Sequence, residues 1–300
     1  MTIKRYPVLP PSRLAFFSRS WLTLWVAICP AVFAIADEPA KIDRDAIRDA
    51  LHFHAPFDES ADARVFAGDG RIRTADSAKL LRVSPGLTAP GVSLVRDAGK
   101  HGGCLRFARK TEQVVLFEGL EMPYAEQDWS GTVSLWLRLD PDEDLPPGYC
   151  DPLQITDKAW NDAAFFIDFD RDLPRDFRLG VFSDYGHWNP DDIPWADWPV
   201  DQRPMITKRR PPFSAERWTH VAWTFENVNP TGDAVSRATL FLDGEPVGSL
   251  EGSWKFHWEP ANVSVLLGLS YVGDLDELMI FRRALSGDEV RFLYENPAGP

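Results

Sequence analysis

Hydrophobic and polar residues alternate along several short segments of the chain, as expected for β-strands. In residues 132–139 (TVSLWLRL), every second residue from Val133 to Leu139 is aliphatic, so these side chains share one face of an extended strand. Five further segments rich in β-branched and aromatic residues are candidate strands, namely residues 113–117, 165–169, 177–182, 218–225 and 263–269. The pattern predicts a protein built mainly from short strands.

Turn residues separate these segments. Residues 239–250 (TLFLDGEPVGSL) place Asp243 and Gly244 between two apolar runs, which predicts a hairpin because a type I′ turn needs positive φ at both central residues. The chain has 25 prolines and 20 glycines, and many of them fall between the predicted strands. Many short strands without alternating helices favour an all-β fold, a two-sheet antiparallel sandwich or jelly roll.

The closing segment, residues 273–294 (GDLDELMIFRRALSGDEVRFLY), predicts a strand followed by a short helix. Period-2 alternation puts Leu275, Glu277 and Met279 on one face of that strand. Ser286 followed three residues later by Glu289 is a capping box, in which each side chain satisfies a backbone donor at the helix start. The chain is therefore expected to end in a strand and a capped helix.

Six segments occur in an order that is similar to a known family. They are LHFHAPFDESADA at 51–63, GKHGGCLRFARKTEQVVLF at 99–117, DWSGTVSLWLRLDP at 128–141, RWTHVAWTFE at 217–226, ATLFLDGEPVGSL at 238–250 and the closing segment. Together they resemble the LamG-like jelly-roll domains of the concanavalin A-like lectin/glucanase superfamily. The resemblance implies a concanavalin A-like jelly roll over residues 50–297, with an insertion rich in Trp, Asp and Pro at about 142–213.

The N-terminus has the features of a secretory signal peptide. A basic stretch precedes the apolar run WLTLWVAICPAVFAIA, and Ala34-Ile35-Ala36 forms an A-x-A cleavage site. A membrane anchor is the alternative, although the run is short for a bilayer span. We therefore expect residues 1–36 to be removed, residues 37–49 to form a tether or short helix, and the protein to be secreted or extracytoplasmic, in a periplasm or at a cell surface.

The charge of the chain excludes nucleic acid as a partner. Residues 1–36 hold four of the 32 basic residues and none of the 45 acidic ones, so the net charge of −13 becomes −17 without them. Phosphate binding needs a basic surface, whereas cations and neutral ligands remain compatible with this charge.

Two cysteines follow the predicted signal peptide. Cys104 and Cys150 can form a disulfide in an oxidising compartment, and two unpaired thiols are the alternative. We favour the disulfide.

Acidic residues suggest two kinds of chemistry. Asp274 and Asp276 superficially match the acidic motif of the superfamily's retaining glucanases, but the pair of glutamates that those enzymes use is absent. The resemblance instead implies that Asp58, in the opening strand, and Asp276, in the closing strand, help to hold a structural Ca²⁺ ion. Ordinary solvated or hydrogen-bonded carboxylates are the alternative.

The insertion offers the best candidate ligand surface. Sugar recognition combines stacking on aromatic rings with hydrogen bonds from Asp and Asn, and residues 149–200 supply both. The candidate ligand-binding residues are Trp160, Asn161, Asp162, Tyr185, His187 and Trp188. The alternative is that this segment folds back and buries its aromatic residues as a satellite core.

These observations predict a secreted, non-catalytic LamG-like module that binds a polysaccharide, a cell-surface glycan or an extracellular protein. A glycoside hydrolase or lyase of the same superfamily, using acids of the insertion, is the second hypothesis. A structural protein of a cell surface or matrix is the third.

Overall fold

The computed structural model describes residues 42–300, which fold mainly as β-strands. The signal peptide expected at residues 1–36 lies outside the described residues. Within residues 42–300, no helix has the length and apolar character needed to cross a membrane.

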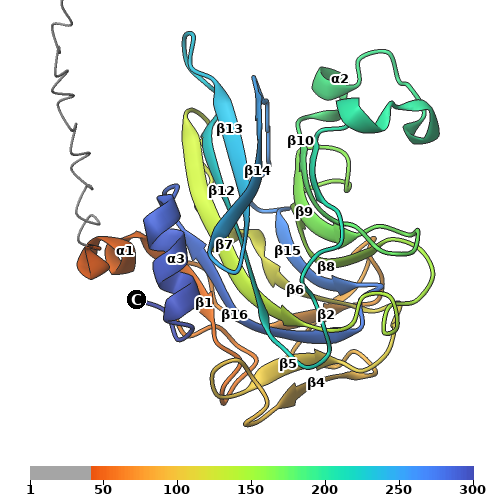
Figure 1. Ribbon diagram of the computed structural model, residues 1–300, viewed down its shortest axis with the longest axis vertical. Helices are drawn as coiled ribbons and strands as arrows, with labels where there is room; N and C mark the ends of the chain where they lie inside the picture. Colours follow the sequence, from red (N-terminus) through yellow and green to blue (C-terminus); the bar gives the residue numbers. More distant parts are fainter. Residues whose placement is uncertain (1–41) are drawn as a thin grey trace, which may run out of the picture. The chain divides into compact units, whose positions relative to one another are not determined.

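The strands form two antiparallel sheets of eight strands each (Figure 1). The first sheet has the order β14 (Glu245–Gly252), β13 (Ser236–Leu242), β12 (Thr219–Val228), β7 (Trp129–Arg138), β16 (Gly273–Phe281), β5 (Cys104–Phe107) and β4 (Val92–Val95), and β1 (Leu51–Ala55) also pairs with β16. The second has the order β11 (Met205–Lys208), β10 (Phe177–Phe182), β9 (Ala164–Phe169), β8 (Cys150–Thr156), β15 (Ser264–Leu269), β6 (Val114–Glu118), β2 (Arg73–Ala75) and β3 (Val83–Pro85). This arrangement confirms the predicted all-β jelly-roll sandwich.

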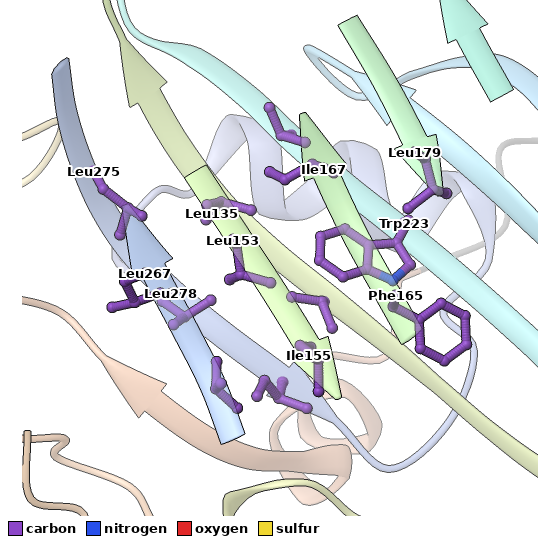
Figure 2. Close-up of a cluster of buried hydrophobic side chains, with 14 of the residues drawn as sticks. Leu135, Leu153, Ile155, Phe165, Ile167, Leu179, Trp223, Leu267, Leu275 and Leu278 are labelled. Carbon is purple, nitrogen blue, oxygen red and sulfur yellow. The ribbon is translucent and has the colours of Figure 1, made fainter. Parts of the chain in front are cut away.

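The main core lies between the two sheets. Figure 2 shows Leu135 and Trp223 of the first sheet packed with Leu153 and Phe165 of the second, and all four side chains are fully buried. Successive residues of a strand point to opposite faces, so every second residue of the central strands enters this core. Burying large apolar side chains in this way supplies most of the free energy that stabilises such a fold.

The predicted hairpin joins β13 to β14. Asp243 has a φ of 50° and Gly244 a φ of 79°, so both central residues adopt the positive φ that a type I′ turn requires. The alternating segment at 132–139 likewise lies in β7, except for its last residue, which follows the strand.

Two helices cover the outer face of the first sheet (Figure 1). Helix α1 (Arg44–Ala50) contributes Ile47, and helix α3 (Gly287–Glu295) contributes Val290 and Leu293, to a second apolar cluster with residues of β12, β13 and β16. The remaining helical turns are α2 (Tyr185–Trp188) and the 3-10 turns η1 (Gly119–Glu121), η2 (Trp195–Asp197) and η3 (Val200–Gln202).

The predicted capping box begins helix α3. The Ser286 hydroxyl accepts a hydrogen bond from the Glu289 backbone N–H at 3.2 Å, and the Glu289 carboxylate accepts one from the Ser286 N–H at 2.8 Å. We expect Ser286→Ala to lower the free energy of unfolding by about 1 kcal/mol, because one backbone donor of the helix loses its partner. Urea denaturation measures this change. Ser93→Ala, at the exposed position of β4, is the control, and an equal loss there would contradict a capping effect.

The predicted alternation of β16 is wrong beyond Asp276. The pairing of β16 with β7 shifts between Asp276 and Met279, and Glu277 has a φ of 50°. Leu275, Leu278 and Ile280 therefore point into the core, whereas Glu277 does not. A β-bulge places two residues opposite one and reverses the phase of every later side chain, which period-2 alternation cannot reveal.

The predicted disulfide is absent from the structure. Cys104 lies in β5 of the first sheet and Cys150 in β8 of the second, and both are fully buried free thiols. The Cys150 Sγ contacts the carbonyl oxygens of Pro146 and Gly148, at 3.5 and 3.7 Å. Burial raises the pKa of Cys104 to about 12 and that of Cys150 to about 11, which favours the protonated thiols.

Candidate functional site

A strip of polar side chains crosses the face of the second sheet that points away from the core. Asp151 and Gln154 come from β8, Asp168 from β9 and Arg178 from β10. Neighbouring residues of these strands, such as Leu153, fill the core, so alternation directs Gln154, Asp168 and Arg178 outward. Asp151 lies three residues before Gln154 and reaches the same face because the register of β8 shifts between Cys150 and Leu153. The strip thus follows from the strand pattern of three adjacent strands.

Aromatic side chains surround this strip. Tyr149, Trp160, Phe166 and Trp195 line a cavity of about 330 Å³ together with the four polar residues. A more polar depression of about 740 Å³ shares Tyr149, Arg178, Trp195 and Met205 with the cavity and extends past Arg203. We call the cavity and this depression together the groove, and the four polar residues its floor.

The centre of the floor is a buried ion pair. Asp168 and Arg178 are direct partners across β9 and β10, and they are 2% and 5% exposed. The Arg178 guanidinium binds the Asp168 carboxylate through two hydrogen bonds, of which the Nε–Oδ1 bond is 2.9 Å long. It also lies 3.2 Å from Asp170 and 4.9 Å from the centre of the Tyr149 ring. Such a bidentate pair fixes the position of both side chains.

Asp151 and Gln154 are the unpaired polar groups of the floor. Neither side chain forms a hydrogen bond or ion pair with any residue in the described part of the chain, although Gln154 is only 7% exposed. Burial, followed by the charge of Asp168, holds the pKa of Asp151 well above its usual range. The floor therefore offers a carboxyl group and an amide that a ligand can bind.

The walls of the groove supply flat apolar surfaces. Trp160 is 39% exposed, and its ring packs edge-on against Phe166, Phe182 and Trp195 at centroid distances of 5.4–6.2 Å. The Arg203 guanidinium lies 4.1 Å from the centre of the Trp195 ring. Because its neighbours hold the ring in place, Trp160 can stack on a ligand without a large loss of conformational entropy.

The six ligand-binding candidates from the sequence occupy two different environments. Trp160 lines the groove, whereas the other five do not and instead bond to one another or, for His187, to the segment that follows β14. The Trp188 Nε1 donates to the Asn161 carbonyl at 2.8 Å, and the Tyr185 N–H donates to the Asp162 carboxylate at 2.8 Å. His187 lies 2.6 Å from the Ser253 carbonyl oxygen. Trp188 also packs with Phe166 and Phe182 in a small apolar cluster, as the satellite-core alternative expects.

The two calcium-ligand candidates also have different roles. The Asp276 carboxylate accepts hydrogen bonds from the backbone N–H groups of Lys100, His101 and Glu277, at 2.7, 3.2 and 2.8 Å. These bonds use both of its oxygens. Asp58 instead faces His101, across a distance of 3.9 Å between its Oδ1 and the imidazole Nδ1. Asp276 therefore anchors a loop beside Asp58 through backbone donors.

Asp274, the other aspartate of the acidic motif, forms ion pairs within the first sheet. Its carboxylate binds Arg106 at 2.7 Å and Arg138 at 2.6 Å. With Asp274 in two ion pairs and Asp276 bound to backbone donors, the closing strand does not present a pair of free carboxyl groups.

Two charged residues at outward positions of predicted strands could have indicated the floor of the groove from the sequence. In residues 165–169 (FFIDF), Asp168 stands at the outward position of an otherwise apolar strand. Arg178 stands at an outward position of the next predicted strand, so a hairpin between the two brings opposite charges together. Asp151 gave no comparable signal, because its approach to Asp168 depends on the long-range pairing of β8 with β9 and β15.

A family model for the concanavalin A-like lectin/glucanases superfamily matches residues 123–291, more than half of the chain. A comparison with curated proteins found no match.

Solved structures of other proteins are similar in fold at low sequence identity. The binding domain of botulinum neurotoxin serotype D is 11% identical, with a TM-score of 0.51, and the match covers 84% of this chain and 53% of that one. Domain 4 of an extracellular GH43 arabinanase from Geobacillus stearothermophilus, in complex with arabinotriose, is 17% identical with a TM-score of 0.49, covering 81% of this chain and 98% of that one. This chain thus spans about half the length of the toxin structure.

Proposed function

The chain belongs to the concanavalin A-like lectin/glucanase superfamily, and from this premise we propose that it is a secreted module that binds a carbohydrate chain in the groove. The observation that carries the proposal is the combination of a fixed, half-exposed Trp160 with the unpaired polar groups of Asp151 and Gln154. A pyranose presents an apolar C–H face and a rim of hydroxyl groups, so it needs both kinds of contact at once.

The acidic charge of the protein is consistent with this ligand class. A neutral polysaccharide meets no electrostatic barrier at a surface that repels polyanions. The signal-peptide features of residues 1–36 support secretion, which would bring the groove into contact with extracellular or cell-surface glycans.

The test is retention of the purified protein on a panel of insoluble and immobilised polysaccharides. For a polysaccharide that retains the protein, we expect Trp160→Ala to lower the affinity by tenfold or more, since a stacked aromatic anchor is worth about 1.4 kcal/mol or more. The variant should remain folded at the temperature of the assay, with a small loss of melting temperature, because Trp160 is 39% exposed but packs against Phe166 and Phe182.

Two further variants separate binding from folding. Phe66→Ala removes an aromatic side chain that is 51% exposed and does not line the groove, and it should leave retention unchanged. Trp188→Ala should lower the melting temperature, because it removes a ring from the cluster around Phe182. The proposal fails if no polysaccharide retains the protein, or if Trp160→Ala binds as well as Phe66→Ala.

Glycoside cleavage in the same groove is the second candidate function. The observation that favours it is the contrast between two neighbouring carboxyl groups, since Asp168 is paired with Arg178 whereas Asp151 has no hydrogen-bond or ion-pair partner among residues 42–300. Burial favours the protonated form of Asp151, and a general acid for glycoside cleavage must carry a proton.

Release of reducing ends from the same panel distinguishes the two candidates. If the protein is an enzyme, Asp151→Asn should abolish release while the polysaccharide is still retained, because the amide keeps the size of the acid but cannot donate its proton to the leaving group. Retention without any release of reducing ends supports the non-catalytic module.

A further inference from the structure

The bulge in β16 creates an unusual environment for Glu277. Because the strand is interrupted there, Asp276 and Glu277 both leave the core between Leu275 and Leu278. Glu277 is 1% exposed and has a φ of 50°, which few residues other than glycine adopt. The backbone thus holds a carboxylate inside the protein at a position where ordinary alternation would not put it.

The two oxygens of Glu277 are used differently. Oε2 lies 2.5 Å from the His54 Nε2, and the His54 Nδ1 accepts a hydrogen bond from Arg64 at 3.3 Å, so the imidazole donates to Glu277 through Nε2. Oε1 is buried and has no hydrogen-bond partner among the described residues. A buried carboxylate oxygen without a partner lowers the stability of the folded protein. A bound cation would remove this cost.

Two further ligand atoms converge on Oε1. The His101 Nδ1 lies 3.5 Å from it and 3.9 Å from the Asp58 Oδ1, and the three ligand atoms are all within 4.8 Å of one another. Bonds of 2.0–2.1 Å to a tetrahedral zinc ion separate neighbouring ligand atoms by about 3.4 Å. Small movements of these side chains, of which His101 is exposed, therefore bring the three atoms to this geometry.

The backbone around Asp58 is shaped to hold its carboxylate. The Gly103 N–H donates to the Asp58 Oδ1 at 3.2 Å. A Cβ atom on Gly102, whose φ is 59°, would lie 2.0 Å from the same oxygen, so only glycine permits this approach. Asp276 holds the adjacent segment through Lys100 and His101, as metal sites often do with their outer neighbours.

We propose that Asp58, His101 and Glu277 bind a divalent transition-metal ion of the zinc type, in place of the calcium ion that the resemblance implies. Calcium takes six to eight oxygen ligands, whereas this set has one imidazole nitrogen and two carboxylates. A four-coordinate ion held by three protein ligands has one position left for water or another ligand. A depression lined by Glu59, Arg96 and Asp97 reaches Asp58 and His101 from the solvent and gives the ion a route of access.

The site joins three parts of the chain that are far apart in sequence. Asp58 follows β1, His101 precedes β5, and Glu277 lies in β16, the strand to which both β1 and β5 pair. A metal ion at this point would therefore stabilise the pairing of the first strand with the last one. The site is independent of the groove, which lies on the other sheet.

Metal binding to the purified, chelator-treated protein tests the proposal. We expect one equivalent of Zn²⁺ by equilibrium dialysis and a rise in melting temperature with Zn²⁺, because an ion that binds only the folded state stabilises it. Co²⁺ at the same site should give the visible absorption of a four- or five-coordinate ion. His101→Ala should weaken Zn²⁺ binding at least tenfold and should melt like the unsubstituted protein without metal, because the His101 side chain is 54% exposed.

Two comparisons decide the outcome. Glu277→Gln should also lose Zn²⁺ binding, and His257→Ala, which removes an exposed imidazole beside Asp184, should keep it. The proposal is wrong if the protein binds no metal, or if His101→Ala binds Zn²⁺ like the unsubstituted protein. It is also wrong if Ca²⁺ raises the melting temperature more than Zn²⁺ and does so equally in His101→Ala, since an oxygen-only site would then hold the ion.

Discussion

Replacing Arg178 by leucine should lower the free energy of unfolding by about 3–5 kcal/mol, the cost of breaking a buried ion pair by removing one partner. Arg178 is 5% exposed and binds Asp168, which is 2% exposed, through two hydrogen bonds. It also contacts Asp170 and the face of the Tyr149 ring. Without the guanidinium, the Asp168 carboxylate remains buried beside Asp151 and Asp170 with no compensating cation.

Equilibrium urea denaturation at neutral pH measures this loss. Arg171→Leu is the matched control, because Arg171 is 62% exposed on the side-chain scale and its ion pair with Asp172 lies at the surface. The control should change the free energy of unfolding by less than about 0.5 kcal/mol. A loss below about 1 kcal/mol for Arg178→Leu would mean that water or a rearranged side chain compensates Asp168.

A double variant links this stability to the function of the groove. Arg178→Leu combined with Asp168→Leu removes both charges, so it should recover much of the stability lost in Arg178→Leu alone. It should not recover glycan retention, because the floor would lose two of its polar groups. Recovery of stability without recovery of retention would show that the two charges serve binding as well as folding.

The strands and the closing helix could be predicted from the sequence because their signals are local. Alternation in residues 132–139 depends on the two-residue period of a strand, and the hairpin at Asp243-Gly244 depends on two adjacent residues. The capping box of Ser286 and Glu289 spans four residues. In each case the physical cause lies within a few residues of the pattern, so no tertiary contact is needed to recognise it.

The groove and the metal cluster could not be predicted because they depend on strand order. Asp151 lies near Asp168 because β8 pairs with β9. The register of that pairing shifts at a bulge between Cys150 and Leu153. Glu277 meets Asp58 because β16 pairs with β1, and a bulge directs its side chain. Alternation assigned Glu277 to the face of Leu275, which is the wrong side. The disulfide prediction was wrong for the same reason, since Cys spacing does not reveal which sheet each cysteine joins.

The contribution of His220 to the stability of the fold should be lost steeply as the pH falls from about 6.5 to about 3. His220 lies in β12 and is fully buried, with its Nε2 at 2.8 Å from the Ser134 hydroxyl. Burial, followed by the nearby charge of Lys100, lowers the pKa of His220 to about 3. The ring packs at 5.0 Å from Trp136 and 6.1 Å from Tyr294, so no water surrounds a protonated imidazole.

The sign of the effect follows from proton binding. Between the unfolded pKa of about 6.5 and the folded pKa of about 3, the unfolded chain binds a proton at this residue that the folded chain does not bind. The free energy of unfolding therefore falls as the pH falls through this range, by up to about 1.4 kcal/mol per pH unit for one proton. Above pH 6.5 the imidazole of His220 is neutral in both states, so it does not make the free energy of unfolding depend on pH.

Urea denaturation of His220→Gln from pH 7 to pH 4 isolates the contribution of this residue. Glutamine keeps a hydrogen-bonding group for Ser134 but binds no proton, so the variant should lose stability at neutral pH. Relative to the unsubstituted protein, it should then gain stability as the pH falls below about 6.5, because it lacks the proton uptake of His220 on unfolding. Ser134→Ala is the control, because it removes the hydrogen bond and keeps the buried imidazole. Its curve should shift downward by about 1 kcal/mol and keep its slope. Equal slopes for His220→Gln and the unsubstituted protein would show that His220 is not the group that takes up the proton, and the acid sensitivity would then lie elsewhere in the fold.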